Sequence, residues 1–387
     1  MVASGRAIRV TQFDGAQVEG DTGLERATVV HQDGTPALHD VTLLAGPGEL
    51  LAVLGPSGSG KSSLLRAIAG LMKVQSGRVL IRGEATTAPT PARNVAMVFE
   101  NAQLVPFLDV ARNMGFGLET RKVPQHEVTR QVEAQSRRLR VSRLLHRMPT
   151  DISAGQRGQV GIGRALVRTP RAFLLDEPLA HVDVHERARM RRVIAETVRA
   201  TKVSTLYVTH DQSDAMAIGD RIAVLNEGAV AQIGTAREIY DRPATLFVAD
   251  FVGEVPIGQL EGRIVESAGV LGFQVGYRTL PTWLPVPPEL AGAVGRPVTL
   301  GLRGEDVRDA GDRPDPDHAV VFGRVRGVDF NGRDAHAKVQ VGEHLLMARF
   351  PGRTALRIGD EVNLAVDAAR AHVFDPVTGV ALYHPPT

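Results

Sequence analysis

The sequence predicts an α/β domain built on a largely parallel sheet, interrupted by helices and followed by a small all-β domain. From Ala27 to about Val248, short apolar runs alternate with helical stretches, the pattern of parallel strands connected by helices. From about Gly258 onward, short alternating segments are separated by Gly and Pro, which is typical of small barrels. We therefore expect three parts: an N-terminal extension at 1–25, the α/β domain at 26–250 and a β-barrel domain at 251–387.

The composition fits a folded protein and excludes several other classes. The chain has 387 residues, of which 43% are hydrophobic and 23% charged. It has no Cys, which excludes disulfides and thiolate metal sites. The net charge of +2 gives no field strong enough to indicate nucleic-acid binding. No apolar run approaches the roughly 18 residues of a membrane span, and the N-terminus lacks a signal-peptide core, so we expect a soluble, cytosolic chain.

The elements of the first two parts follow in chain order. Residues 1–25 are polar and Gly-rich, with one strand-like piece, AIRVTQF, that we interpret as an extension or an extra edge strand. Five apolar runs then predict strands: ELLAVLG, NVAMVFE, RAFLLDEP, STLYVTH and DRIAVLN. Strand signals vanish between Leu104 and Pro170, where the amphipathic, Arg-rich stretch HEVTRQVEAQSRRLRVSRLL predicts a helical subdomain at about 101–170.

The β-rich part contains two similar stretches, GQLEGRIVE and VVFGRVRGV, which form a weak internal repeat. Each is a short strand-like segment bounded by turn residues. The repeat favours two related barrels, with DRPDPDH as an exposed loop between them.

A glycine-rich stretch between a predicted strand and a predicted helix carries the strongest functional signal. Residues 55–62, GPSGSGKS, match G-x-x-x-x-G-K-[ST] in the strand-to-helix context that phosphate binding requires. The glycines let backbone N–H groups converge on phosphate oxygens, and the helix N-terminus adds partial positive charge. Lys61 should reach the β- and γ-phosphates, and the Ser62 hydroxyl should ligate Mg²⁺. The predicted nucleotide contacts in this loop are Gly55, Pro56, Ser57, Gly58, Ser59, Gly60, Lys61, Ser62 and Ser63.

Two carboxylates follow a later apolar run. The strand AFLLDEP carries Asp176 and Glu177 to its C-terminal end, where ligands bind in parallel sheets. Alone, an apolar run followed by Asp-Glu is more often a strand entering a turn, but the phosphate loop makes the pair a strong signal. We expect Asp176 to hold the Mg²⁺ shell and Glu177 to polarise the attacking water as general base.

His210 ends the strand STLYVTH and is the next catalytic candidate. A single His at a strand end is usually structural. Its position after the second acidic strand favours a contact with the γ-phosphate. The residues by themselves therefore predict a Mg²⁺-dependent ATPase with an α/β P-loop NTPase fold.

The stretch ISAGQRGQVGIGRAL resembles the signature motif of ABC transporter ATPases, usually Leu-Ser-Gly-Gly-Gln followed by a helix. Ser and Gly at a helix N-terminus form a second anion site. The resemblance implies that this site closes on ATP held by the phosphate loop of the opposite subunit. PLAHVD, with Asp183, resembles the loop that follows the second acidic strand in the family. The contacts implied here are Ser153, Ala154, Gly155, Gln156 and Asp183.

The stretch VTHDQSDAMAIGDRIAVLNEGAVAQIGTAREIYDRPATLFVADFVG narrows the resemblance to ATPases of bacterial importers for sugars and glycerol phosphates, relatives of those for polyamines, iron and molybdate. LGLRGEDV and AHVFDPVTGVAL resemble landmarks of their regulatory domain, which is built of small OB-like barrels. The resemblance implies ATP and Mg²⁺ as cofactors and a homodimer at the cytoplasmic face of the membrane. It also implies two permease subunits and, indirectly, a solute-binding protein. The cargo that it favours is a carbohydrate.

Three positions depart from the family pattern. Glu100 in MVFENAQLVPF replaces a Gln that touches Mg²⁺ and the attacking water in the family, so we expect it to bind the cation. His31 falls on or near the position of the adenine-stacking aromatic, although HQDG reads equally well as a polar turn. Ala154 replaces a Gly, which a helical backbone tolerates.

Two alternatives stay open. A soluble ABC-type ATPase without a transport role is disfavoured by the linker IYDRPATLFVADFVG and by the β-rich tail. The C-terminal barrels would also suit a small-ligand sensor or a docking site for a regulatory protein, and this role is compatible with import.

Overall fold

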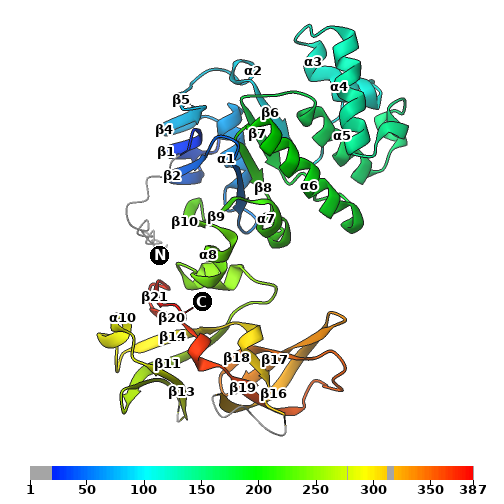
Figure 1. Ribbon diagram of the computed structural model, residues 1–387. Helices are drawn as coiled ribbons and strands as arrows, with labels where there is room; N and C mark the ends of the chain where they lie inside the picture. Colours follow the sequence, from blue (N-terminus) through cyan, green and yellow to red (C-terminus); the bar gives the residue numbers. More distant parts are fainter. Residues whose placement is uncertain (1–19, 277, 312–317, 387) are drawn as a thin grey trace. The chain divides into compact units, whose positions relative to one another are not determined.

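The computed structural model describes residues 20–276, 278–311 and 318–386. The chain divides into two compact units, one ending at Ala236 and the other beginning at Arg237 (Figure 1). This boundary lies before residue 250, the predicted end of the α/β domain, which falls within the stretch IYDRPATLFVADFVG. The structure instead assigns the linker to the second unit. The predicted extra strand, AIRVTQF, lies outside the described residues.

The core of the first unit is a six-stranded sheet in the order β10-β9-β3-β8-β7-β6. Strands β6, β7, β8, β3 and β9 are parallel, and β10 is an antiparallel edge strand. Every residue of β3, β7 and β8 is buried, as expected for strands covered on both faces. All five predicted runs lie in this sheet. The bounds are β3 Leu50–Leu54, β6 Val95–Val98, β7 Ala172–Asp176, β8 Thr205–Val208, β9 Arg221–Asn226 and β10 Ala229–Gly234.

A second, antiparallel sheet has the order β2-β1-β4-β5. Its strands are β1 Thr22–Val30, β2 Pro36–Ala45, β4 Val74–Ile81 and β5 Glu84–Ala85. Leu24 pairs with Leu43 and is fully buried, so residues 22–25 belong to this sheet rather than to an extension. Helix α1 (Lys61–Ala69) contacts strands of both sheets (Figure 1), which share one apolar core around it.

The region between β6 and β7 is helical, as predicted. It contains α3 Val110–Glu119, α4 Gln125–Arg138, two short 3₁₀ turns (Ser142–Leu144 and Pro149–Asp151) and α5 Ala154–Leu166. Helix α4 buries only Val128, Val132 and Ser136, so most of its Arg-rich surface faces solvent. The other helices of this unit are α2 Thr90–Arg93, α6 Val184–Thr201 and α7 Gln212–Ile218.

The second unit contains one closed barrel and one open sheet. The barrel has the order β15-β18-β17-β16-β19, and the open sheet has the order β13-β12-β11-β14-β20-β21. The barrel strands are β15 Val307–Asp309, β16 Ala319–Phe330, β17 Asp334–Val341, β18 His344–Pro351 and β19 Glu361–Val366. The sheet strands are β11 Gly258–Ser267, β12 Val270–Val275, β13 Arg278–Pro285, β14 Pro297–Leu302, β20 His372–Phe374 and β21 Ala381–Tyr383.

The expectation of two related barrels is therefore wrong. GQLEGRIVE forms most of β11 in the open sheet, whereas VVFGRVRGV lies within β16 in the barrel. The sheet stays open because, among the described residues, its edge strand β13 pairs only with β12 and its other edge strand β21 only with β20. Of the predicted loop DRPDPDH, residues 312–317 lie outside the described residues.

Three short helices and two 3₁₀ turns complete the described part of the second unit. Helix α8 (Ala236–Asp241) and α9 (Leu246–Phe251) precede the sheet, and α10 (Pro288–Ala291) follows β13. Two 3₁₀ turns lie at Gly304–Asp306 and Ala368–Arg370. Throughout the described ranges, none of the helices has the length and apolarity that crossing a membrane requires.

Candidate nucleotide-binding site

The phosphate loop connects β3 to α1 and is shaped by its glycines. Gly60 has φ 101°, and a Cβ there would lie 2.6 Å from the Ala37 carbonyl oxygen. Gly55 is equally confined, since a Cβ would lie 2.4 Å from the Leu225 carbonyl oxygen. Only Gly allows the loop to pass this close to both neighbouring segments. No side chain caps α1 at Gly60, so the first-turn N–H groups stay available to an anion.

The side chain of Lys61 folds back toward the start of this loop. Its side chain is buried, and Nζ donates to the carbonyl oxygens of Gly55 at 2.7 Å and Pro56 at 2.8 Å. Burial lowers the pKa of Lys61, and the charges of Glu177 and Asp176 oppose that shift. A cation removed from water in this way gains from an anionic ligand. The Ser59 hydroxyl is also buried without a hydrogen-bond partner among the described residues, so the loop holds unused polar groups.

Ser62 and Asp176 bring two oxygen ligands together from separate elements. Ser62 Oγ, on the first turn of α1, donates to Asp176 Oδ1 at 3.1 Å. Burial raises the pKa of Asp176, the Ser62 hydrogen bond lowers it, and the nearby charges of Glu177 and Glu100 raise it again. A buried carboxylate beside a hydroxyl and other carboxylates suits a hard divalent cation, which these oxygens would hold as ligands.

Glu177 and His210, predicted from separate motifs, are in direct contact. Glu177 Oε2 lies 2.6 Å from His210 Nδ1. Glu177 has φ 45°, a left-handed conformation that is uncommon for a residue with a side chain. Its N–H donates to the Val208 carbonyl oxygen, which fixes the end of β7 to the end of β8. The structure therefore assembles the two predicted catalytic side chains at adjacent strand ends.

Glu100 lies on the exposed turn after β6, close enough to raise the pKa of Asp176. After Asn101, both Ala102 and Gln103 have positive φ, at 52° and 40°. Arg164 of α5 holds this strained backbone by donating to the Ala102 carbonyl oxygen at 2.7 Å and to that of Gln103 at 2.9 Å. Sequence reasoning missed Arg164, since an Arg on an amphipathic helix gives no sign of such a contact.

The signature stretch begins α5. Ser153 is its N-cap, and a reciprocal capping box joins Ser153 Oγ to the Gln156 N–H and Gln156 Oε1 to the Ser153 N–H. Ser153 and Ala154 are exposed, and Ala154 already has a helical backbone that accommodates its methyl group. Gly155 is confined, because a Cβ would lie 2.8 Å from the His181 carbonyl oxygen.

Asp183 and His31 lie outside this buried set. Asp183 is the exposed residue before α6, and its side chain does not cap the helix. His31 lies in the exposed turn between β1 and β2, where its N–H donates to the Thr35 carbonyl oxygen at 2.8 Å. Adenine stacking by His31 stays a prediction.

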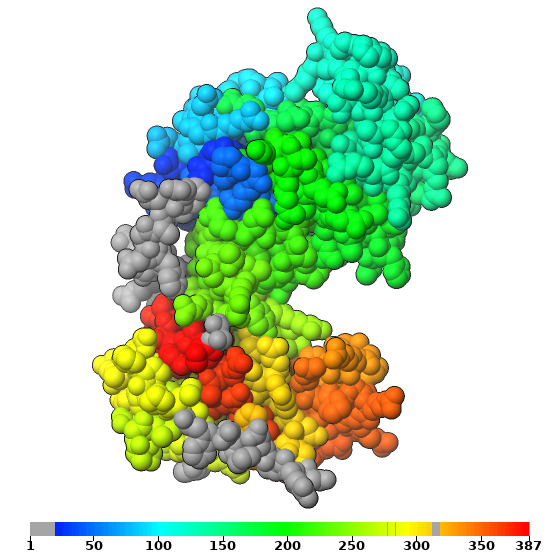
Figure 2. Space-filling view, in the orientation of Figure 1, coloured from blue at the N-terminus to red at the C-terminus, as the bar shows by residue number. Residues whose placement is uncertain are grey.

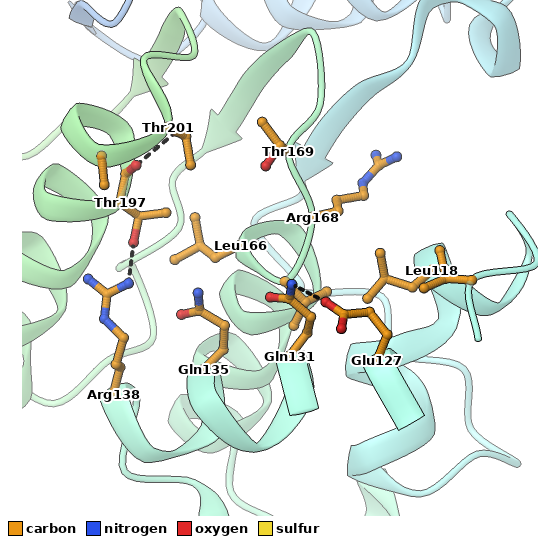
Figure 3. A pocket seen from close by; sticks show the side chains of 13 residues that line it. Leu118, Glu127, Gln131, Gln135, Arg138, Leu166, Arg168, Thr169, Thr197 and Thr201 are labelled. Atoms are coloured by element: carbon orange, nitrogen blue, oxygen red, sulfur yellow. Dashed lines mark hydrogen bonds between the residues drawn. The ribbon is translucent and has the colours of Figure 1, made fainter. Parts of the chain in front are cut away.

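A cavity of about 360 Å³ lies elsewhere in the first unit, between α4 and the C-terminal ends of α5 and α6 (Figure 3). Gln131, Gln135 and Leu166 are among its lining residues. It contains none of the predicted site residues. It is therefore separate from the phosphate loop.

Two family models match parts of this chain. A family model described as ABC transporter matches residues 38–180, and one described as TOBE domain matches residues 300–374. The trehalose/maltose import ATP-binding protein MalK of Thermococcus litoralis is 38% identical over 356 residues, covering 90% of this chain and 95% of the relative. The chain belongs to the ABC transporter ATP-binding proteins. It is accordingly an ATP hydrolase, and its α/β fold with a small closed barrel is the one predicted.

Other relatives and solved structures point to the same family. The sn-glycerol-3-phosphate import ATP-binding protein UgpC of Cereibacter sphaeroides is 39% identical, covering 89% of this chain and 95% of the relative. The dimeric, ADP- and phosphate-bound ATP-binding cassette MJ0796 matches with a TM-score of 0.52 and 26% identity, over 56% of this chain and 99% of that one. CbiO1 of Clostridium perfringens, part of the transporter complex cbiONQ, matches with a TM-score of 0.52 and 27% identity, over 57% of this chain and 90% of that one.

Proposed function

We propose that this ABC transporter ATP-binding protein drives import of a carbohydrate or a related polyol phosphate. The observation that carries the proposal is its 38% and 39% identity, over about nine-tenths of the chain, to import proteins for trehalose/maltose and for sn-glycerol-3-phosphate. The C-terminal match to a TOBE domain extends the likeness beyond the ATPase unit. Importers for polyamine, iron or another ion are the nearest alternatives.

Each group of site residues has a separate role in ATP hydrolysis. The phosphate-loop N–H groups and Lys61 bind the β- and γ-phosphates, and Ser62, Asp176 and Glu100 would hold Mg²⁺. When bound, Mg²⁺ neutralises charge on the phosphates. Glu177 accepts the proton of the attacking water, and His210, 2.6 Å from Glu177, orients that carboxylate and contacts the γ-phosphate.

Some of the residues predicted to contact ATP are exposed, and a second copy of the chain would bring ATP to them. Ser153, Ala154 and Asp183 are exposed, and none of them lies in the buried phosphate-loop side of the site. Two copies facing head to tail would place each Ser153 at the partner's phosphate loop, and a symmetric pair would hold two ATP. The dimeric MJ0796 structure supports this arrangement.

The helical part of the first unit fits a membrane partner. Figure 2 shows these residues, in cyan, as a projecting lobe. Phe107, just after the Glu100 turn, is 77% exposed, and Phe116 on α3 is 42% exposed. Aromatic side chains are enriched at protein–protein interfaces, and a partner seated on this lobe would cover these two. We assign this surface to two permease subunits, with the chain bound peripherally at the cytoplasmic face and a solute-binding protein acting beyond the membrane.

Transport by the purified complex tests the proposal. We expect ATP-dependent uptake of at least one sugar or glycerol phosphate from a panel, and loss of that uptake with Glu177→Gln. Polyamine and ferric-iron arms separate the nearest alternatives. No uptake of any solute in the panel, together with no permease co-purifying from the native membrane, would indicate the soluble, non-transport ATPase instead.

A further inference from the structure

The cavity between α4 and the C-terminal ends of α5 and α6 has both apolar and polar walls (Figure 3). Its volume of about 360 Å³ lies at the lower end of the range for small-molecule sites, roughly 300–1,000 Å³. Leu118, Val123 and Leu166 contribute apolar side chains. Gln135 of α4 and Thr201 of α6 contribute polar ones. A cavity with this combination can hold a small molecule and fix its orientation.

Gln135 carries an unused hydrogen-bonding group in this cavity. Its Oε1 is buried and has no hydrogen-bond partner among the described residues. Figure 3 shows the amide directed toward Leu166, between Arg138 and Gln131. A buried amide oxygen without a donor destabilises the folded chain, and such groups are rare in folded proteins. A ligand that donates a hydrogen bond to Oε1 would remove this cost.

The α6 wall offers a second acceptor. Thr197 Oγ1 is already used, because it donates to the Val193 carbonyl oxygen at 2.8 Å and accepts from Arg138 Nη1 at 3.1 Å. Thr201 Oγ1 donates to the Thr197 carbonyl oxygen at 2.8 Å. Its proton is therefore used within α6, while its lone pairs can accept from a ligand. Both walls thus favour a ligand that brings hydrogen-bond donors.

The charged side chains that line the cavity have partners within the protein. The pairs are Glu127 with Arg130, Arg138 with Glu196, and Arg168 with the Val95 carbonyl oxygen. An anion would bring further acceptors toward Gln135 Oε1. A cation would meet two guanidinium groups and one carboxylate, so it would be repelled. The unused groups therefore favour a neutral ligand whose donors are hydroxyls.

We propose that this cavity binds a small neutral polyhydroxy compound, a monosaccharide or a linear polyol, whose hydroxyls donate to Gln135 Oε1 and Thr201 Oγ1. The C–H groups of the ligand pack on Leu118, Val123 and Leu166. Because α4 and α6 each supply an acceptor, the ligand bridges these helices and stabilises the folded chain. The inference goes beyond the proposed function and does not depend on it, since the cavity contains none of the predicted ATP-site residues.

Binding to the full-length protein tests the proposal, with ADP and Mg²⁺ present to occupy the phosphate loop. The neutral probes are D-glucose, D-mannose, D-galactose and sorbitol, measured by saturation-transfer NMR and titration calorimetry. Concentrations stay below about 10 mM, because polyols at high concentration stabilise any protein by exclusion from its surface. We expect saturable binding of at least one probe, with a dissociation constant on the order of 1 mM.

Two charged relatives of glucose test the ligand class. D-Glucosamine adds a positive charge and glucose 6-phosphate adds negative charge, while both keep the sugar ring. We expect each to bind at least about tenfold more weakly than the best neutral probe, because the cavity repels a cation and offers an anion no unused donor. Charged probes that bind as tightly would overturn the assigned class.

Substitutions locate the bound ligand. Gln135→Leu should weaken binding at least about tenfold, while the melting temperature of the unliganded protein stays the same or rises, because the unpartnered oxygen is removed. Ala200→Phe should abolish binding, since Ala200 lines the cavity at an exposed position of α6 where a larger side chain can be accommodated. Gln125→Leu is the matched control, because Gln125 is exposed at the start of α4, outside the cavity, and its loss should leave the affinity unchanged.

Three further results would overturn the inference. They are the absence of saturable binding by all four neutral probes, wild-type affinity in both Gln135→Leu and Ala200→Phe, and an equal loss of affinity in Gln125→Leu. ATP hydrolysis by each variant shows that it is folded. Absence of ATP-driven uptake by the wild-type complex would overturn the proposed function and leave this inference standing.

Discussion

The two sides of the nucleotide site differ in how completely one chain builds them. On the phosphate-loop side, Lys61 and Asp176 are 7% and 5% exposed. Lys61 donates to carbonyl oxygens of its own loop, and Asp176 accepts from Ser62 on a distant segment. On the signature side, Ser153 and Asp183 are exposed, and Ser153 is satisfied by a capping box local to its own helix. We therefore expect one chain to bind the phosphates by itself, whereas the exposed signature side leaves surface for a second chain.

The largest expected effect is on the phosphate-loop side, where one substitution should stop ATP hydrolysis without weakening nucleotide binding. Glu177→Gln should lower kcat by about 10²- to 10⁴-fold, the usual contribution of a general base, because the amide does not accept the proton of water. Nucleotide affinity should be retained, since Lys61 and the loop N–H groups are unchanged. Equilibrium binding of a fluorescent ATP analogue and a phosphate-release assay measure the two quantities. Retained hydrolysis would show that another group acts as base.

A smaller effect is expected on the signature side. Gly155→Ala places a Cβ 2.8 Å from the His181 carbonyl oxygen, so either α5 or the segment between β7 and α6 must shift. We expect a loss in kcat of about tenfold, in the range of a single positioning defect, with ATP binding by the isolated chain unchanged. Gly158→Ala is the matched control, because its Cβ would have nothing closer than 3.8 Å. Equal losses in both variants would contradict the proposed role of this contact.

Substitution of Glu100 tests how negative charge near Asp176 affects the phosphate-loop side of the site. Glu100 adds to the negative charge that raises the pKa of Asp176. Two unit charges about 4 Å apart repel by roughly 4 kcal/mol at an effective dielectric of 20, so Glu100 should weaken nucleotide binding unless Mg²⁺ is present. Glu100→Gln should raise ATPase activity or lower the Mg²⁺ concentration required, by several-fold. Unchanged Mg²⁺ and ATP titrations would contradict this.

Asp306, in the second unit, is a second carboxyl group whose pKa burial raises, as it does for Asp176. Burial, with the charges of Glu305 and Asp367, raises the pKa of Asp306 to about 6. Because the folded value lies above the unfolded value of 3.8, the folded state binds the proton more tightly, and stability rises as pH falls from about 7 toward 5. Asp306→Asn should flatten this trend and raise the melting temperature at pH 7.5 by a few degrees, as calorimetry would show. If the pH dependence of the melting temperature is unchanged in this variant, groups other than Asp306 cause it.

The chemistry of the site could be predicted from the sequence because its residues belong to short, local patterns. GPSGSGKS must lie between a strand and a helix, and AFLLDEP must end at the ligand-binding edge of the sheet. The five apolar runs likewise predicted five of the six strands of the central sheet, since strands buried on both faces are continuously apolar. The half-buried edge strand β10 was not predicted.

Only the tertiary structure decided the features that depend on contacts between distant segments. Arg164 and Arg187 look like ordinary helical surface residues until their guanidinium groups are seen on the carbonyls of Ala102 and Ala180. Strands β11 and β16 have similar sequences, but β11 lies in an open sheet and β16 in a closed barrel because they pair with different strands. A local pattern specifies a residue's conformation and chemistry, but its partner is selected by the fold of the whole unit.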